Sequence, residues 1–175
     1  MPEFELPPAP KEIGIFKDVI FKWEHRDKEG NVIVQGEHHL DLMTNQGLSW
    51  LSSQMAGSVT GACTVMCLGT ATATPTMGDA TLGGEITGSG LSRTTGSTSG
   101  VGAVVGTAPS GQTNQTTGSF YVVYTFTASG TVTVNEAGLS PSTTYNAGVV
   151  VHDLLSPAAT MAAGDTLYSS FQFIL

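Results

Sequence analysis

Charge is the property that this sequence has least of. Only 11% of its 175 residues are Asp, Glu, Lys or Arg, whereas charged residues make up about a quarter of a typical soluble domain. The charges are also unbalanced, since 14 acidic residues outnumber 6 basic ones and give a net charge of -8. A chain so poor in Lys and Arg is a poor candidate for binding phosphate backbones. We therefore expect no nucleic-acid partner.

Long hydrophobic runs are also missing. No uninterrupted apolar run approaches the roughly 20 residues that a membrane helix needs, and no basic amphipathic helix is present that would lie on a lipid surface. The opening sequence MPEFELPPAPKE lacks the basic and apolar regions of a secretory signal. We therefore expect no membrane partner.

Cysteine is scarce, and its spacing excludes two common uses. If Cys63 and Cys67 share a strand, they lie about 13 Å apart, which is too far for a disulfide with Cα atoms within about 7 Å. Their spacing also differs from that of common zinc knuckles. We interpret both as small buried hydrophobic residues, and reduced thiols fit assembly in a cytoplasm.

Glycine, serine and threonine are abundant, while strong helix formers are few. The 22 glycines exceed the average share of about 7%, and this mixture favours short strands joined by many turns. The length suits one domain with a hydrophobic core. Strands are predicted at residues 63–68, 81–86, 91–94, 101–105, 119–127, 130–137, 148–155 and 166–175.

The segment MTNQGLSWLSSQMAG predicts the one helix. Thr44 or Asn45 can cap it, and Leu48, Leu51 and Met55 recur at helical spacing. Gly57 is suited to end it.

The chain divides into three parts along its length. Residues 1–15 form a Pro-rich arm that we expect to be extended. Residues 16–42 predict a β-hairpin, whose turn DKEGN supplies Gly30 for a positive φ. Residues 43–175 predict a β-sandwich domain. The predicted fold class is all-β: a jelly-roll-like β-sandwich with one short helix, an extended N-terminal arm and a β-hairpin.

The few charges gather near the N-terminus. Residues 42–175 hold only six charged side chains in 134 positions. Mixed charge usually keeps a surface free of association, so we expect neighbouring subunits to cover much of this part. The alternative is a neutral but hydrated surface of Ser, Thr and Gly. The candidate partner contacts are apolar residues of the arm and hairpin: Phe4, Leu6, Pro7, Pro8 and Trp23.

Two polar motifs contain residue types that could form a site. In EHHLD, the donors Glu37, His39 and Asp41 share one strand face, but at a spacing of about 6.6 Å one ion could take all three only if the strand bends. In VHDLL, His152 and Asp153 point to opposite faces, so they form no catalytic dyad. The sequence has no G-x-S-x-G elbow and no P-loop. We therefore predict no metal, no cofactor and no enzymatic activity.

The stretch VTVNEAGL places a carboxylate where burial begins. Glu136 follows Asn135 and precedes Gly138 by two positions, which suits a carboxylate that accepts backbone N–H bonds in a tight turn or bulge. A buried charge needs partners, and the candidates are backbone amides or Arg93. We predict a structural turn formed by Glu136, Asn135 and Gly138.

Four segments in order carry a resemblance to a known group of proteins. MTNQGLSWLSSQM, CLGTATATPTMGDATLGGEI, FTASGTVTVNEAGLS and GVVVHDLLSPAATMAAGDTLYSSFQFIL together resemble a diffuse set of tailed-bacteriophage virion proteins, over about residues 42–175. Ala71 departs from the L-G-T-G-like loop of that set. The matching positions are Asn45, Gly47, Leu48, Leu68, Gly69, Thr70, Pro75, Asp79, Leu82, Glu136, Ala137, Gly138, Leu139, Gly164 and Asp165.

The resemblance implies a β-rich structural protein of the virion that assembles into a multimer and catalyses nothing. Among virion roles, a capsid decoration (cement) protein is favoured, acting as a homotrimer on the major capsid protein after assembly in the host cytoplasm. The alternative is a tail, tail-tip or fibre-base protein with a receptor- or glycan-binding face. A glycan hydrolase would need paired carboxylates about 5 to 9.5 Å apart, and residues 42–175 hold only five carboxylates.

Overall fold

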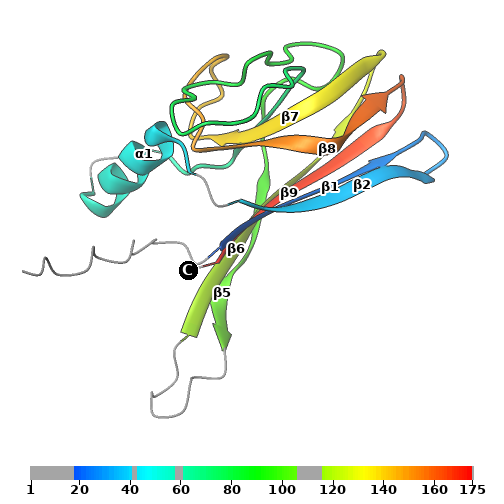
Figure 1. The fold of residues 1–175 in the computed structure, drawn as a ribbon. Coiled ribbons are helices and arrows are strands. Elements are labelled where there is room, and N and C mark those ends of the chain that lie inside the picture. Colours follow the sequence, from blue (N-terminus) through cyan, green and yellow to red (C-terminus); the bar gives the residue numbers. More distant parts are fainter. Residues whose placement is uncertain (1–17, 41–42, 58–60, 106–115, 175) are drawn as a thin grey trace, which may run out of the picture.

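The computed structural model describes residues 18–40, 43–57, 61–105 and 116–174. The predicted arm at 1–15 lies outside the described residues. Within the described ranges the chain forms one helix and two antiparallel sheets (Figure 1). The elements are β1 (Asp18–Arg26), β2 (Val32–Leu40), α1 (Asn45–Met55), β3 (Val65–Gly69), β4 (Thr94–Thr95), β5 (Ser97–Val105), β6 (Thr116–Thr127), β7 (Val132–Ser140), β8 (Val151–Met161) and β9 (Thr166–Ile174).

The two sheets lie face to face as a sandwich. The larger sheet has the strand order β2-β1-β9-β6-β5, and the smaller has the order β4-β3-β7-β8. In Figure 1, β7 and β8 form one layer above β9, β1 and β2, and the ends of β5 and β6 extend beyond it. The prediction of a mostly β protein with one short helix is confirmed.

Alternation along the strands builds the core between the sheets. In β1, Val19, Phe21 and Trp23 are buried, whereas the intervening Lys22 is exposed, as expected when successive side chains point to opposite faces. Phe21 stacks on Trp23 and on Phe171, with ring centroids 5.1 and 4.5 Å apart. The smaller sheet contributes Met66, Leu68, Val134, Ala137, Leu139, Val151, Leu155, Ala159 and Met161 to the same core.

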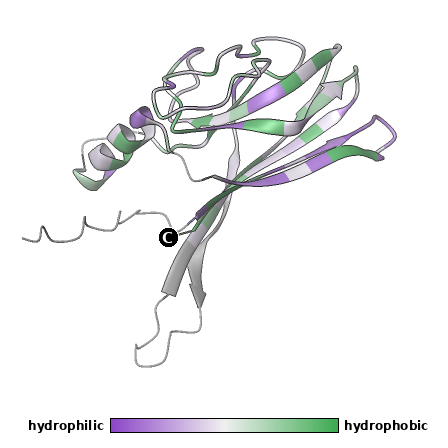
Figure 2. Ribbon diagram, viewed as in Figure 1, coloured by the Kyte–Doolittle hydropathy of each residue, from purple (hydrophilic) through white to green (hydrophobic). Residues whose placement is uncertain are grey.

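The hairpin predicted at 16–42 is part of the larger sheet. Its turn is formed as expected, with Gly30 at a φ of +88°, and Figure 2 shows hydrophilic residues along it. Strand β1 pairs along its length with the last strand, β9. The larger sheet therefore contains strands from both sides of residue 42, where the predicted hairpin ends and the predicted β-sandwich domain begins.

The strand predicted at 81–86 is wrong. These residues form a loop that meets β3 through a single bridge between Gly69 and Glu85. Strand β7, by contrast, continues past Ala137 to Ser140 because β3 and β8 pair with it on both sides. Hydrogen-bond partners on both edges decided where β-structure forms.

Helix α1 forms where predicted, but two of its apolar residues stay exposed. Thr44 caps it by accepting a hydrogen bond from the Gly47 N–H at 3.0 Å. Gly47 is the buried residue of the helix, and a Cβ there would lie 2.3 Å from the Val150 carbonyl oxygen. The helix therefore touches the sandwich through its backbone at Gly47 and through the partly buried Trp50, and leaves Leu48 47% and Met55 74% exposed.

Candidate functional site

The side chain of Glu136 lies at the centre of a buried polar cluster. It projects from β7 and is fully buried. Its Oε1 accepts hydrogen bonds from the backbone N–H of Ala71 at 3.3 Å and Gly84 at 2.9 Å, and its Oε2 accepts one from Gly83 at 3.2 Å. One carboxylate thus holds both ends of the loop that follows β3.

His152 completes this cluster from the neighbouring strand β8. Its Nε2 lies 2.9 Å from Glu136 Oε2, and its Nδ1 lies 3.2 Å from Asp79 Oδ2. Asp79 also accepts hydrogen bonds from the Thr76 N–H at 2.7 Å and the Thr76 hydroxyl at 2.8 Å. We call Glu136, His152 and Asp79 the carboxylate–histidine cluster.

The cluster favours its charged form. Burial alone would raise the pKa of Glu136, but His152 and the amides of Gly84 and Gly83 outweigh burial and hold that pKa below its ordinary value. Burial likewise would lower the pKa of His152, yet Glu136 and Asp79 outweigh it and raise the pKa. A protonated His152 between two carboxylates is the arrangement that these contacts stabilise.

Strand β3 passes so close to the Glu136 carboxylate that its last residue, Gly69, has no room for a side chain. A Cβ on Gly69 would lie 2.2 Å from Glu136 Oε1, so a larger residue would displace the carboxylate. Asn135 points the other way, and its Nδ2 donates to the Thr70 carbonyl at 2.7 Å. A Cβ on Gly138 would lie 2.9 Å from the Val151 carbonyl.

Two details of the sequence-based interpretation of Glu136 need correction. Asn135, Glu136 and Gly138 lie within strand β7 and not in a turn, although the pairing with β8 shifts between Val134 and Glu136 as in a bulge. The expected amide donors are present. Arg93, the other candidate partner, pairs with Glu85 and donates to two carbonyls instead.

His152 as a partner of Glu136 was missed by sequence reasoning. The neighbour of His152 in the sequence, Asp153, faces the other way and pairs with His38 at 2.9 Å. The actual partners lie 16 and 73 residues away. A buried carboxylate and a histidine on two successive predicted strands were the available signal.

The cluster offers little to a substrate. The side chains of Glu136 and His152 are 1% and 5% exposed, and every oxygen of Glu136 already accepts hydrogen bonds. In the described ranges no group of three or more His, Cys, Asp or Glu side chains is arranged to hold a metal ion. The arrangement can hold a proton and join the loop to strands β7 and β8.

Trp23, a predicted partner contact, packs inside the chain. It is 2% exposed, stacks on Phe21 and meets His38 edge-on, with centroids 4.9 Å apart. Its indole covers Gly36 on the paired strand β2. The indole therefore offers a partner no surface, because the hairpin it belongs to is part of the sandwich. The other predicted contacts, Phe4, Leu6, Pro7 and Pro8, lie outside the described residues.

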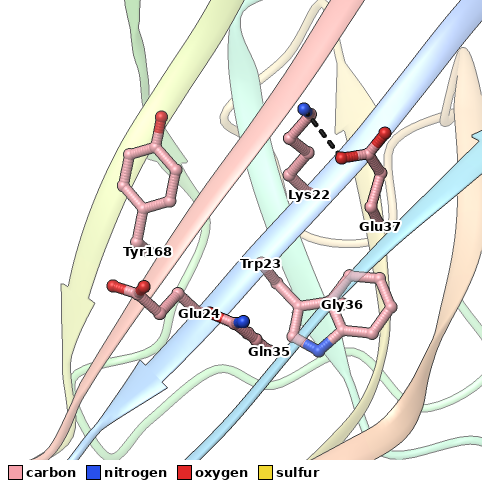
Figure 3. Close-up of a pocket in the computed structure, with 7 residues that line it drawn as sticks. All are labelled: Lys22, Trp23, Glu24, Gln35, Gly36, Glu37 and Tyr168. Atoms are coloured by element: carbon pink, nitrogen blue, oxygen red, sulfur yellow. Dashed lines mark ion pairs between the residues drawn. The ribbon is translucent and has the colours of Figure 1, made fainter. Parts of the chain in front are cut away.

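The outer face of the larger sheet carries a shallow groove of about 600 Å³. Its walls are two cross-strand pairs: Lys22 with Glu37, joined at 2.7 Å, and Glu24 with Gln35. Tyr168 borders it from β9, as Figure 3 shows. We call it the outer-face groove.

The EHHLD motif lies on the strand that borders this groove. Glu37 pairs with Lys22, and His39 Nδ1 lies 2.7 Å from Asp18. Asp41 lies outside the described residues. The motif therefore forms an exposed polar strand face as far as the structure describes it.

Both cysteines are buried and unbridged, as predicted. Burial raises the pKa of both thiols, that of Cys67 to about 12, so neither is a ready nucleophile.

Comparisons with protein-family models, with curated proteins and with solved structures each found no match. None of the described helices has the length and apolar character to cross a membrane.

Proposed function

We propose that this chain is a structural virion protein of a tailed bacteriophage, a capsid decoration (cement) protein that acts by binding and not by catalysis. It would join the major capsid lattice as a homotrimer, after assembly in the host cytoplasm. As part of this proposal, the β-sandwich has a jelly-roll-like topology. The pairing of the first strand β1 with the last strand β9 supports that topology.

The observation that carries the proposal is the convergence of the motif residues on one structural cluster. The segments with L-G-T, Asp79, Leu82 and E-A-G-L are far apart in sequence, yet the Glu136 carboxylate and His152 join them. The G-D motif serves packing too, since Asp165 accepts a hydrogen bond from the Ala162 N–H and contacts His25. Motifs that maintain a scaffold are what a structural protein needs.

Decoration would act through binding energy. A protein that binds the assembled lattice but not the separated subunits stabilises the lattice by mass action, and each added interface slows its opening. The charge-poor part from 42 to 175 and the outward apolar residues of α1 supply surface suited to such interfaces.

Labelling of virions tests the proposal. Antibodies raised against the purified protein would be imaged on intact particles of the phage that encodes it. We expect label spread over the head. Particles without label on head or tail would refute a virion role, while label confined to the tail would replace decoration by the alternative below.

The alternative is a tail, tail-tip or fibre-base protein with a face that binds a host receptor or glycan. The outer-face groove favours it, because Tyr168 is 39% exposed and hydrogen-bonding side chains surround it, a combination suited to a polar ligand. A glycan array probed with wild type and with Tyr168→Ala tests it. Binding that Tyr168→Ala abolishes would support this role, and no binding to any glycan would remove the glycan part of it.

A further inference from the structure

A second, apolar hollow lies between α1 and the end of the sandwich. Its volume is about 540 Å³. Phe120 and Phe173, neighbours on β6 and β9, stack side by side there with ring centroids 4.7 Å apart. We call this the α1 groove, and its principal lining residues are Trp50, Leu51, Cys63, Phe120, Val150 and Phe173.

The α1 groove is lined mainly by apolar side chains. The Nε1 atom of Trp50 is enclosed and has no partner among the described residues, so this donor is not offered to an occupant. The groove therefore suits an occupant that brings apolar side chains.

The N-terminal sequence of this chain has that chemistry. Residues 1–10, MPEFELPPAP, carry Phe4 and Leu6 as apolar side chains. Their four prolines lack an N–H, so the backbone presents carbonyl oxygens with few competing donors. Pro-rich segments bind aromatic-lined grooves in this way and lose little conformational freedom on binding.

We propose that the α1 groove binds residues 1–10 of a second copy of this chain. Phe4 and Leu6 fill its apolar floor. When each subunit places its residues 1–10 in the α1 groove of the next subunit around a closed ring, these contacts join the subunits of a symmetric oligomer.

The described chain begins beside the α1 groove. Val19 pairs with Phe173, which lines the groove, and Asp18 pairs with Ile174 one position further along.

The surface around the groove favours a second copy. Leu48 and Met55, two of the apolar residues of α1, are 47% and 74% exposed. One decapeptide in the groove leaves these side chains in water, whereas a neighbouring subunit that delivers the decapeptide can cover them. The inference goes beyond the virion role and does not depend on it, since this contact forms in solution without a particle.

Photo-crosslinking of the full chain tests the contact and its direction. Phe4 is replaced with p-benzoyl-phenylalanine in ¹⁵N-labelled protein, which is mixed with unlabelled wild type and irradiated. We expect cross-links from the labelled arm to unlabelled peptides of α1 or of the β6 and β9 ends. The same probe at the exposed Ile33 of the hairpin is the control and should not reach these peptides. Cross-links within labelled chains alone, or none to the groove, would overturn the proposal.

The two tryptophans provide a matched second measurement. Both indole N–H groups lack a partner in the described structure, but only Trp50 lines the groove. In ¹⁵N spectra of the full chain, the double variant Phe4→Ser, Leu6→Ser should shift the indole resonance of Trp50 and leave that of Trp23 in place. An unmoved Trp50 resonance in the double variant would contradict the proposal.

Discussion

At the scale of single residues, Glu136 shows how a charge-poor core accommodates a carboxylate. A buried charge is destabilising unless hydrogen bonds surround it, and Glu136 has three backbone amides and His152 around its two oxygens. The amides come from one loop, and the histidine comes from the next strand. The carboxylate therefore determines how that loop lies against the sheet.

Replacing Glu136 with Gln tests this role. The side chain keeps its shape, but its new NH₂ group faces N–H donors, so we expect a loss of about 1–3 kcal/mol in the free energy of unfolding. Urea denaturation measures it. Glu37→Gln is the control, because Glu37 is half exposed and pairs with Lys22 at the surface, and its midpoint should stay near wild type. An equal midpoint for Glu136→Gln and wild type would show that the cluster adds no stability.

The same pair predicts a pH optimum. The pKa of Glu136 lies below its ordinary 4.5, so its contribution is complete above pH 4.5 and is lost as the pH falls through the lowered pKa. The pKa of His152 lies above its ordinary 6.5, so its contribution is complete below pH 6.5 and is lost as the pH rises through the raised pKa. Together they contribute most to stability between pH 4.5 and 6.5.

Denaturation from about pH 4 to about pH 9 would measure this dependence. We expect the unfolding free energy of wild type to decline above pH 6.5. His152→Gln should be less stable throughout and should show a shallower decline over that interval. A variant that keeps the full decline would assign it to another group.

At the scale of elements, the hairpin β1–β2 is held by Trp23. Gly36 lies opposite Trp23 on β2, and the indole occupies the space where a side chain at position 36 would stand. His38 on the same strand reaches Asp153 on β8, which links the two sheets. The hairpin is therefore part of the sandwich, and its strand β2 forms an edge of the larger sheet.

Substitution of Gly36 tests this packing. A Cβ on Gly36 would lie 2.1 Å from the Trp23 ring, so Gly36→Ala should lower the free energy of unfolding by about 1–3 kcal/mol through overpacking. Gly88→Ala is the matched control, since nothing lies within 4 Å of a Cβ there, and it should be neutral or slightly stabilising. The indole fluorescence of Trp23 reports the displacement. Equal stabilities of the two variants would mean that the indole moves aside without cost.

At the scale of elements, a buried ion pair also connects two loops. Arg93 contacts Glu85 through two nitrogens and donates to the carbonyls of Ser142 and Ala147. The two charged side chains are 4% and 0% exposed. The single basic residue of the charge-poor part is thus used inside the fold and adds little to the surface.

At the scale of the whole molecule, we expect self-association. Residues 42–175 hold six charges, of which Glu136, Glu85 and Arg93 are enclosed, so the surface of this part carries fewer still. Light scattering of the purified full chain at micromolar concentration should give three times the 18.1 kDa mass of one chain. A mass of one chain at all concentrations would refute a trimer that forms without the capsid.

The sequence by itself determined those features that depend on residue type and local order. The strand-rich composition, the turn at Gly30, the helix after Thr44, the burial of Cys63 and Cys67 and the need of Glu136 for amide donors all follow from neighbours along the chain. Each reflects backbone geometry or the cost of burial, which act within a few residues.

Only the tertiary structure decided which distant residues meet. His152 reaches Glu136 because β7 and β8 are paired in a register that sets Gly138 opposite His152. Trp23 is enclosed because β1 lies between β2 and β9. Leu48 and Met55 of α1 stay exposed because the helix contacts the sandwich at Gly47 and Trp50. Strand order and register bring together residues that are far apart in sequence, and a one-residue change of register would turn every side chain to the other face.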